Sequence, residues 1–353
     1  MKKVIVGMSG GVDSSVTALL LKKQGYEVIG VNLDLLPNKS CNKPCSNIDS
    51  INDAKKVCEK LDIPFYSLDF KQLFKKHVID YFASEYIKGH TPNPCIACNR
   101  YVKFEELIKV AKENFGAEYI ATGHYAKVEY NEKSGRYYIV ESEAIGKDQT
   151  YVLYSLTQEQ LKHIIMPLGD YTKDEIRKIA EDNGLINANK SDSQEICFVE
   201  DNDYAKYISE NYDYYISCGD FVDTNGNILG KHKGIIHYTV GQRRGLGLSL
   251  KAPLYVTKLD INKNQVVLAP NDKLFSNTLI CTNTNFMPFE KLESPMTVTA
   301  KIRYSAKKAD ATIYPLENRD VKVVFADNQR AITPGQAVVF YNGNVVVGGG
   351  TII

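Results

Sequence analysis

The sequence predicts an α/β protein whose doubly wound, mostly parallel sheet is followed by two small all-β modules, the last of them barrel-like. Short apolar runs alternate with helical patterns over the first half of the chain, which is typical of a parallel sheet with helices on both faces. In the second half, turn signals such as Asn225-Gly226 and Asn342-Gly343 separate short strands, as in β-hairpins. The length of 353 residues exceeds one ordinary core.

The first half contains the signals for each element in turn. Strands are expected at residues 4–6, 28–33, 65–68 and 119–122, and helices at 12–24, 51–61, 70–88 and 104–111. Thr172 and Glu175 have the spacing of a capping box, so a further helix is expected to begin there and to end at Gly184. From about residue 211 the sequence pattern changes to one of successive strands, including 255–259 and 265–268. We therefore predict domains at residues 1–210, 211–275 and 276–353.

Composition limits the classes of function. The 43 basic and 42 acidic side chains leave a net charge of +1, which excludes whole-molecule electrostatic capture of nucleic acid but allows a local basic face. Because no apolar run reaches about 18 residues, no membrane association is predicted and the cytoplasm is the expected location. In that compartment the eight cysteines are expected to be thiols, metal ligands or transient redox partners instead of structural disulfides.

The stretch "VIVGMSGGVDSS" predicts a phosphate-binding loop. Gly7, Gly10 and Gly11 lie between a strand and a helix, where glycine lets the backbone approach an anion and the helix N–H groups face it. The hydroxyls of Ser9, Ser14 and Ser15 can donate hydrogen bonds, and Asp13 can hold Mg²⁺. No lysine follows the glycines, so this is not a Walker loop. The pattern Ser-Gly-Gly-x-Asp-Ser resembles the signature of the ATP pyrophosphatase superfamily, which adenylates a substrate oxygen.

An adenylated oxygen is ready to leave, so the next requirement is a nucleophile, and cysteine thiolates suit that role. Cys95 and Cys98 lie in "TPNPCIACNR" and Cys197 in "SDSQEICFVE", both polar and turn-rich stretches. Cys58 and Cys281, by contrast, are expected to be small buried apolar residues.

Several ordered motifs resemble those of bacterial tRNA-specific 2-thiouridylases, which replace the C2 oxygen of the wobble uridine with sulfur. They are "GMSGGVDSS", "TPNPCIACNRYVKF", "ATGHYA", "KDQTYVLYSL", "SQEICF", "YTVGQRRGLG", "KIRYS" and "TPGQAVVFYNG". The resemblance implies ATP and Mg²⁺ as cofactors, tRNA as substrate, and a cysteine desulfurase or sulfur-relay protein as donor. It implies that the uridine O2 is adenylated with pyrophosphate release, and that sulfur then comes from a cysteine persulfide.

The same resemblance implies roles for individual residues. Cys98 matches the catalytic nucleophile and Cys197 the persulfide carrier. ATP contacts are implied for Gly7, Met8, Ser9, Gly10, Gly11, Val12, Asp13, Ser14, Leu33 and Gly123. Target-base contacts are implied for Asn93, Pro94 and Cys95, and tRNA contacts for His124, Lys147, Asp148, Gln149, Arg303, Tyr304 and Gln336. Further basic candidates are Lys301, Lys307 and Lys308, and the Arg243-Arg244 pair.

Cys95 departs from the family pattern, in which many members have aspartate at this position. Three cysteines, Cys95, Cys98 and Cys197, suit a [4Fe–4S] cluster with one open iron, so cluster chemistry is an alternative to persulfide chemistry. Zinc is a third alternative and requires a fourth ligand such as Cys41 or Cys45. Two competing functions are another adenylating ligase or amidotransferase of the superfamily, and a non-enzymatic tRNA-binding paralogue.

Overall fold

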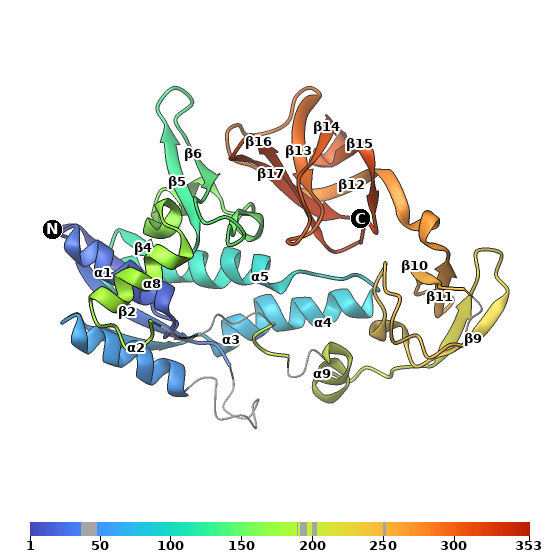
Figure 1. Ribbon diagram of the computed structural model, residues 1–353, viewed down its shortest axis with the longest axis horizontal. Helices are drawn as coiled ribbons and strands as arrows, with labels where there is room; N and C mark the ends of the chain where they lie inside the picture. Colours follow the sequence, from blue (N-terminus) through green and yellow to red (C-terminus); the bar gives the residue numbers. More distant parts are fainter. Residues whose placement is uncertain (37–47, 189, 191–195, 200–202, 250–251) are drawn as a thin grey trace.

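The computed structural model describes residues 1–36, 48–188, 190, 196–199, 203–249 and 252–353. Figure 1 shows three parts, with a central sheet at the left, a barrel at the upper right and a smaller sheet at the lower right. Cys41 and Cys45, the candidates for a fourth zinc ligand, lie outside the described residues. In the part of the chain that is described, no helix is long and apolar enough to cross a membrane.

The central sheet confirms the predicted parallel α/β fold. Its strand order is β3-β2-β1-β4-β7, and every neighbouring pair is parallel. The strands are β1 (Lys3–Gly7), β2 (Glu27–Asp34), β3 (Phe65–Asp69), β4 (Tyr119–Ala121) and β7 (Ile164–Ile165). The first four match the predicted strands, whereas the two-residue strand β7 is too short to be detected from the sequence.

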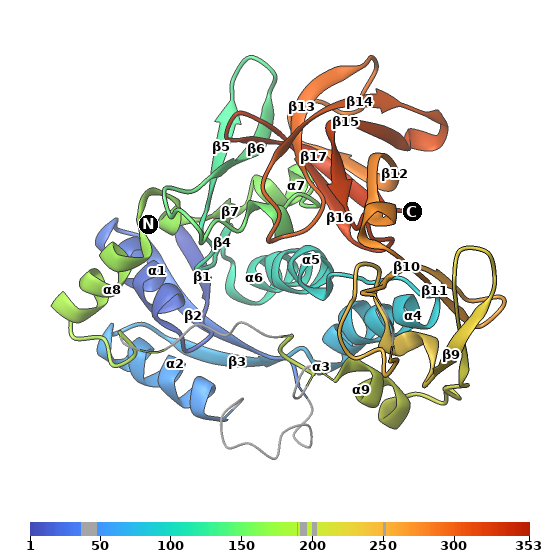
Figure 2. The same ribbon diagram turned by 45° about the vertical axis from the view of Figure 1, so that its right-hand side comes forward.

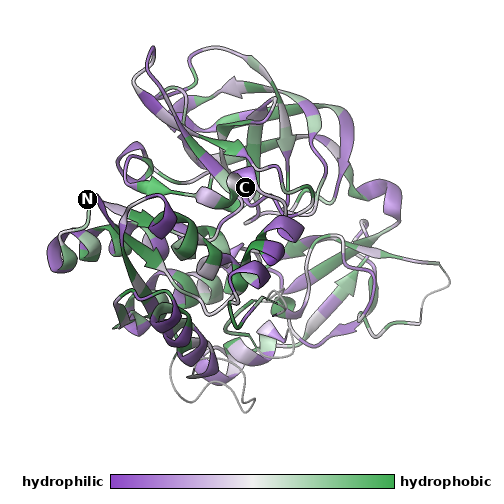
Figure 3. Ribbon diagram, turned by 60° about the vertical axis from the view of Figure 1, so that its left-hand side comes forward, coloured by the Kyte–Doolittle hydropathy of each residue, from purple (hydrophilic) through white to green (hydrophobic). Residues whose placement is uncertain are grey.

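Helices cover both faces of this sheet, because successive side chains of a strand point to opposite faces. Val4 and Val6 pack with α1 (Val12–Lys23), α2 (Ile48–Lys60) and α8 (Lys173–Asp182). Ile5, between them, belongs to the cluster of α6 (Leu107–Phe115) on the other face. The sheet is therefore doubly wound, and its apolar strands stand out from the hydrophilic loops in Figure 3.

Two consecutive helical runs follow β3, and the second of them carries Cys95 and Cys98. The first comprises α3 (Lys71–Phe74), the π-helical segment η1 (Lys75–Ile79) and α4 (Asp80–Ile87), and confirms the helix predicted at residues 70–88. The second comprises α5 (Pro94–Ala97), the π-helical segment η2 (Cys98–Glu106) and α6. It begins ten residues before the predicted start at 104, at Pro94, because Asn93 caps it and proline suits the first helical position.

A hairpin that was not predicted from the sequence links the first part of the chain to the last. Strands β5 (Ala126–Asn131) and β6 (Arg136–Glu141) pair with each other. Val140 of β6 then pairs with Val345 of the C-terminal barrel, so β5 and β6 extend the barrel sheet (Figure 1). The N-terminal segment is thus not a pure alternation of strands and helices.

The two all-β modules are confirmed. The smaller sheet has the order β10-β11-β8-β9, with β8 (Gly219–Val222) and β9 (Ile228–His232) joined through Asn225-Gly226, and β10 (Tyr255–Asp260) paired with β11 (Gln265–Ala269). The C-terminal strands close into an antiparallel barrel because β12 pairs with both β15 and β17. They are β12 (Phe275–Phe286), β13 (Met296–Lys301), β14 (Ala309–Pro315), β15 (Val321–Arg330), β16 (Ala337–Asn342) and β17 (Val345–Ile352).

Short helices complete the described chain. They are the 3₁₀ segments η3 (Thr150–Val152), η4 (Pro167–Asp170), η6 (Ile235–His237), η7 (Asn271–Leu274) and η8 (Glu317–Arg319), and the α-helices α7 (Gln158–Leu161) and α9 (Tyr204–Asn211). Figure 2 shows α5 and α6 between the central sheet and the barrel. The contacts agree, since Ile5, Leu107 and Val339 share one buried cluster. The two boundaries between the three predicted domains remain a prediction.

Candidate active site

The glycine loop between β1 and α1 has the geometry of an anion site. Gly10 adopts φ +73°, and a Cβ at this position would collide with the carbonyl oxygen of Ser50, so only glycine fits. Gly11 caps α1 without a side-chain hydrogen bond. The first N–H groups of α1 are therefore not capped by a side chain and remain available to an anion.

The loop hydroxyls divide into two kinds. Ser9 and Ser14 lie 3.2 Å apart, oxygen to oxygen, and both line a pocket beside the loop. Ser15 is fully buried, donates its hydroxyl hydrogen to the Gly11 carbonyl at 2.9 Å and accepts from Asn187 at 2.8 Å. The expectation that Ser15 donates to a phosphate is therefore wrong in this arrangement, because its position on the buried face of α1 commits it to the protein interior.

The pocket beside the loop has a volume of about 260 Å³. It takes residues from the ends of three neighbouring parallel strands, where ligands of such sheets bind. Its walls include Gly7, Met8, Ser9, Asp13, Ser14, Asn32, Leu33, Lys103, Thr122, Gly123, His124 and Gln149. Leu33 and Gly123, two of the expected ATP contacts, line this pocket, whereas Gly10, Gly11 and the buried Val12 do not. We call this cavity the nucleotide pocket.

Asp13, the expected Mg²⁺ ligand, is held by protein groups. The Lys173 ammonium lies 2.8 and 2.9 Å from its two carboxylate oxygens, and the Tyr125 hydroxyl donates to it at 2.7 Å. A Mg²⁺ ion on this carboxylate would have to compete with Lys173, so the Mg²⁺ role stays a prediction. Lys173 was not identified from the sequence, because nothing local to the start of α8 signals a partner 160 residues away.

The cysteines divide by exposure. Cys98 is 7% exposed, whereas Cys95 and Cys197 are exposed residues. Burial, and to a smaller extent Cys95, raises the pKa of Cys98, while the charge of Lys103 lowers it. Desolvation by the surrounding protein atoms, and to a smaller extent Cys98, raises the pKa of Cys197 to about 12, whereas the charge of Lys103 again lowers it. The three thiols therefore lie within electrostatic reach of one another, as expected from the sequence.

Cys95, Cys98 and Cys197 are not arranged as a set of metal ligands. Within the described ranges, no three His, Cys, Asp or Glu side chains are placed to share a metal ion. The cluster and zinc alternatives therefore find no preformed site here. Cys58 and Cys281 are fully buried, which confirms their expected role as small apolar residues.

Lys103 connects the nucleotide pocket to the thiols. It lines the pocket, and its charge lowers the pKa of Cys98 and that of Cys197. It also acts on His124, whose pKa falls to about 3, mainly through burial. His124 is thus a neutral buried side chain, bonded through Nδ1 to Thr122 at 2.8 Å, and it lies in the nucleotide pocket instead of on an open surface. Lys103 was not identified from the sequence, although its place in η2, five residues after Cys98, was a usable signal.

Some of the residues expected to contact tRNA form hydrogen bonds within the protein. Asp148 accepts hydrogen bonds from Ser142 and Thr150, and burial raises its pKa. Gln149 accepts from the Tyr125 N–H at 2.9 Å. Gln336 donates to the Thr91 carbonyl at 2.7 Å, so the barrel holds the turn that carries Asn93 and Pro94.

The remaining expected contacts lie on the barrel and the smaller sheet. Tyr304 is 43% exposed and donates to the Asp148 carbonyl at 3.1 Å. Lys308 pairs with Glu141 at 2.7 Å, so its charge is neutralised. Arg243 and Arg244 are exposed. A strip of unpaired charges at residues 301–308 is therefore weaker than the sequence suggested.

A doubly wound sheet, a glycine loop that leads from its first strand into a helix, and thiols beside the pocket at that loop define the class of ATP pyrophosphatase (PP-loop) enzymes. The tRNA-specific 2-thiouridylase MnmA of Acetivibrio thermocellus is 56% identical over 99% of both chains, and that of Clostridium perfringens is 55% identical over 99% of this chain and 98% of its own. The chain belongs to the family of tRNA-specific 2-thiouridylases.

Family models match three consecutive segments. They are described as a tRNA methyl transferase HUP domain (residues 2–201), a tRNA methyl transferase PRC-barrel domain (211–270) and an aminomethyltransferase beta-barrel domain (276–352). Solved structures are more distant. A 4-thiouridine synthetase–RNA complex with bound ATP is 18% identical with a TM-score of 0.39, covering 59% of this chain and 50% of its own. A U34-tRNA thiolase from Methanococcus maripaludis with its [4Fe-4S] cluster is 22% identical, with a TM-score of 0.35 and coverage of 59% and 64%.

Proposed function

We propose that this protein converts the wobble uridine of tRNA to 2-thiouridine in an ATP-dependent reaction. The observation that carries the proposal is that Lys103 lines the nucleotide pocket and also acts on Cys98 and Cys197. A pocket for ATP and a group that delivers sulfur therefore share one site, as a reaction with adenylation followed by thiolation requires.

In the first step, O2 of the uridine attacks the α-phosphate of ATP, and pyrophosphate leaves. The open N–H groups of α1 and the hydroxyls of Ser9 and Ser14 support the phosphates. The buried imidazole of His124 stays neutral, so it adds hydrogen bonding without charge. Lys103 supplies a cation in the lining of the same pocket, where it would oppose the negative charge of the adenylate.

In the second step, the terminal sulfur of a persulfide on Cys197 attacks C2, and AMP leaves with the oxygen. The Cys98 thiolate then attacks Sγ of Cys197, which releases 2-thiouridine and leaves a Cys98–Cys197 disulfide. An external thiol must reduce this disulfide before the next turnover. The exposure of Cys197 suits a residue that receives sulfur from another protein, and the burial of Cys98 suits one that acts only inside the site.

The sulfur donor is a cysteine desulfurase or a relay protein. Mg²⁺ would supply charge neutralisation for the phosphates, and Asp13 is the carboxylate that the loop contributes to the nucleotide pocket. The [4Fe–4S] alternative remains a less favoured proposal, since Cys95, Cys98 and Cys197 are not arranged as a ligand set.

A single assay tests the proposed function. Purified protein, ATP, a sulfur donor and unmodified tRNA are incubated, and the nucleosides are analysed by mass spectrometry. We expect 2-thiouridine together with AMP and pyrophosphate in equal amounts. If ATP is consumed and no nucleoside gains sulfur, the protein is a different adenylating enzyme. If neither occurs but tRNA binds, it is a non-enzymatic paralogue.

A further inference from the structure

A second pocket lies between the barrel and the helical run that carries Cys95 and Cys98. Its volume is about 520 Å³, within the range of about 300–1,000 Å³ of small-molecule sites. Lys76 and His77 come from η1, Arg100 and Tyr101 from η2, and Asn283 from the barrel strand β12. No residue lines both this pocket and the nucleotide pocket. We call it the interdomain pocket.

The interdomain pocket is positively charged without compensation. All its lining residues are in the described part of the chain, and none of them is Asp or Glu. Lys76 and Arg100 form no ion pair with any described carboxylate. A pocket with two unpaired cations and a histidine attracts an anion such as a phosphate.

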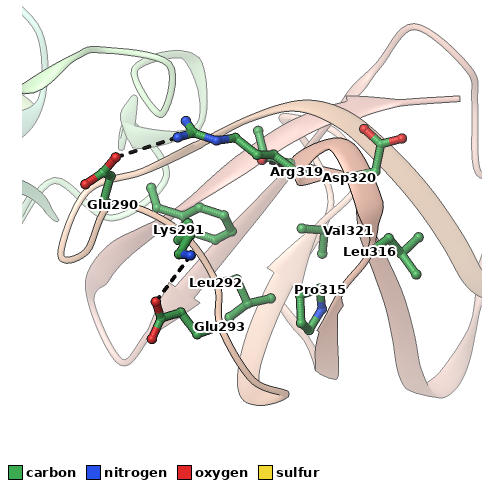
Figure 4. Close-up of a pocket in the computed structure, with 11 residues that line it drawn as sticks. Glu290, Lys291, Leu292, Glu293, Pro315, Leu316, Arg319, Asp320 and Val321 are labelled. Carbon is green, nitrogen blue, oxygen red and sulfur yellow. Dashed lines mark hydrogen bonds and ion pairs between the residues drawn. The ribbon is translucent and has the colours of Figure 1, made fainter.

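A cavity in the barrel provides the contrast. It has a volume of about 350 Å³ and also contains two cations. Arg319 pairs there with Glu290 at 3.6 Å, and Lys291 with Glu293 at 3.5 Å; dashed lines mark both pairs in Figure 4. Both of its cations are paired with carboxylates of the same cavity, so it has no comparable preference for an anion.

The interdomain pocket also presents flat aromatic surfaces. The rings of His77 and Tyr101 stack with centroids 5.2 Å apart and an angle of 28° between planes. The Arg100 guanidinium lies 5.2 Å from the centroid of Tyr101. Single-stranded RNA is commonly bound by such combinations, because an unpaired base stacks on an aromatic or guanidinium plane while cations hold its phosphate.

Two further features indicate that the pocket takes a ligand. Ser155 lines it, is 3% exposed, and its hydroxyl has no partner in the described structure. A buried hydroxyl without a partner calls for a missing group that completes its hydrogen bond. Asn283 has a positive φ of 51° at an irregularity of β12 between Thr282 and Asn285, and such strained residues are concentrated at binding sites.

We propose that the interdomain pocket is a second nucleotide subsite, which binds the base and phosphate of a tRNA nucleotide other than the target uridine. The inference rests on the proposed function, since tRNA is the substrate that supplies such a nucleotide. Asn93, the expected contact of the target base, also lines this pocket, which places the subsite next to the position expected for the target uridine. The subsite positions the strand and takes no part in the chemistry.

The test compares Lys76→Gln, Arg100→Gln and their double variant with wild type, in the full-length protein. Lys76 is exposed, so its variant is not expected to affect folding, and thermal unfolding checks the others. Binding of unmodified tRNA is measured by fluorescence anisotropy at several salt concentrations, without ATP or sulfur donor. We expect the double variant to bind about tenfold more weakly, with the salt-dependence slope reduced by about 1.4, the value for two lost phosphate contacts.

The matched control is the double variant Lys291→Gln and Arg319→Gln in the cavity of Figure 4, which removes the same charge and should bind tRNA like wild type. If both double variants bind tRNA like wild type, the proposal is overturned. If the Lys76→Gln and Arg100→Gln double variant then binds uridine monophosphate more weakly than wild type does, the pocket takes a free nucleotide instead of a tRNA nucleotide. A wild type that neither binds nor thiolates tRNA overturns the proposed function instead.

Discussion

The ammonium of Lys173 lies within 2.9 Å of both carboxylate oxygens of Asp13, at the entrance to helix α1. The glycine loop itself carries no lysine, and α8 brings one to it from a distant part of the chain. With its side chain only 10% exposed, Lys173 balances the charge of a carboxylate that lines the nucleotide pocket. This ion pair therefore sets the charge beside the glycine loop, where the phosphates of ATP are expected.

Replacement of Lys173 by Gln should weaken ATP binding. Without the ammonium, the charge of Asp13 repels the phosphates, and we expect the KM for ATP to rise about tenfold, equivalent to one charge-assisted hydrogen bond. The free energy of unfolding should fall by about 2 kcal/mol, because one partner of a largely buried pair is left alone. Steady-state kinetics and urea denaturation measure the two effects. Lys127→Gln, which removes ion pairs with Glu143 and Asp170 away from the glycine loop, is the control and should leave the KM unchanged.

Cys98→Ser and Cys197→Ser should each reduce thiolation by at least about 10³-fold, as loss of a nucleophile does. The two variants should differ in labelling. When a desulfurase with ³⁵S-cysteine is the donor, Cys98→Ser should still accept label as a persulfide, whereas Cys197→Ser should not. Cys218→Ser is the control, because Cys218 is also exposed but lies in the smaller module. Equal labelling of Cys197→Ser and wild type would contradict the assignment of the persulfide.

Cys95→Asp separates persulfide from cluster chemistry. In the persulfide route Cys95 has no covalent role, so this variant should keep thiolation within about threefold of wild type, a change below 1 kcal/mol. A cluster held by Cys95, Cys98 and Cys197 would lose a ligand and most of its iron. Anaerobic purification followed by iron and sulfide analysis of both proteins provides the second readout. Several iron atoms in wild type, lost together with activity in Cys95→Asp, would establish the cluster route.

Lys103 should control the pH dependence of sulfur transfer. Burial raises the pKa of Cys98, so its reactive thiolate is scarce at neutral pH and the rate should increase as pH rises. Lys103→Gln removes the charge that opposes this effect of burial, and the pKa of Cys98 should rise further. The ascending limb of the pH profile should then move to higher pH, and a rise of about one in the pKa should lower the rate at pH 7 about tenfold.

The measurement for Lys103 is the single-turnover rate of persulfide-loaded enzyme between about pH 6.5 and 9.5. Lys103→Arg keeps the charge and should restore the wild-type profile, which a purely structural role would not predict. Lys109→Gln, on the same helical run but exposed, serves as the control. A Lys103→Gln profile that is scaled down without moving along the pH axis would contradict the proposed effect on the thiolate.

Local signals in the sequence were sufficient for the elements and their order. The period of the apolar residues predicted β1 to β4 and the helices between them, and the Thr172 capping box is formed as expected, with Glu175 as its partner. Asn-Gly pairs marked two of the hairpins. These features depend on residues close together in the chain, so pattern and turn chemistry determine them. The glycine loop between β1 and α1 was likewise predicted from residues that are close together in the chain.

Only the tertiary structure decided how these elements form a site. The ion pair of Asp13 with Lys173, the pairing of Val140 with Val345 and the hydrogen bond of Gln336 to Thr91 each join residues more than 150 positions apart. The charge of Lys103 acts on Cys98 within η2, and it acts on Cys197 because folding brings that residue within reach of the same helix. The residue types that carry the chemistry can be read from the sequence. Their burial, partners and protonation depend on distances and local dielectric, which exist only once the chain has folded.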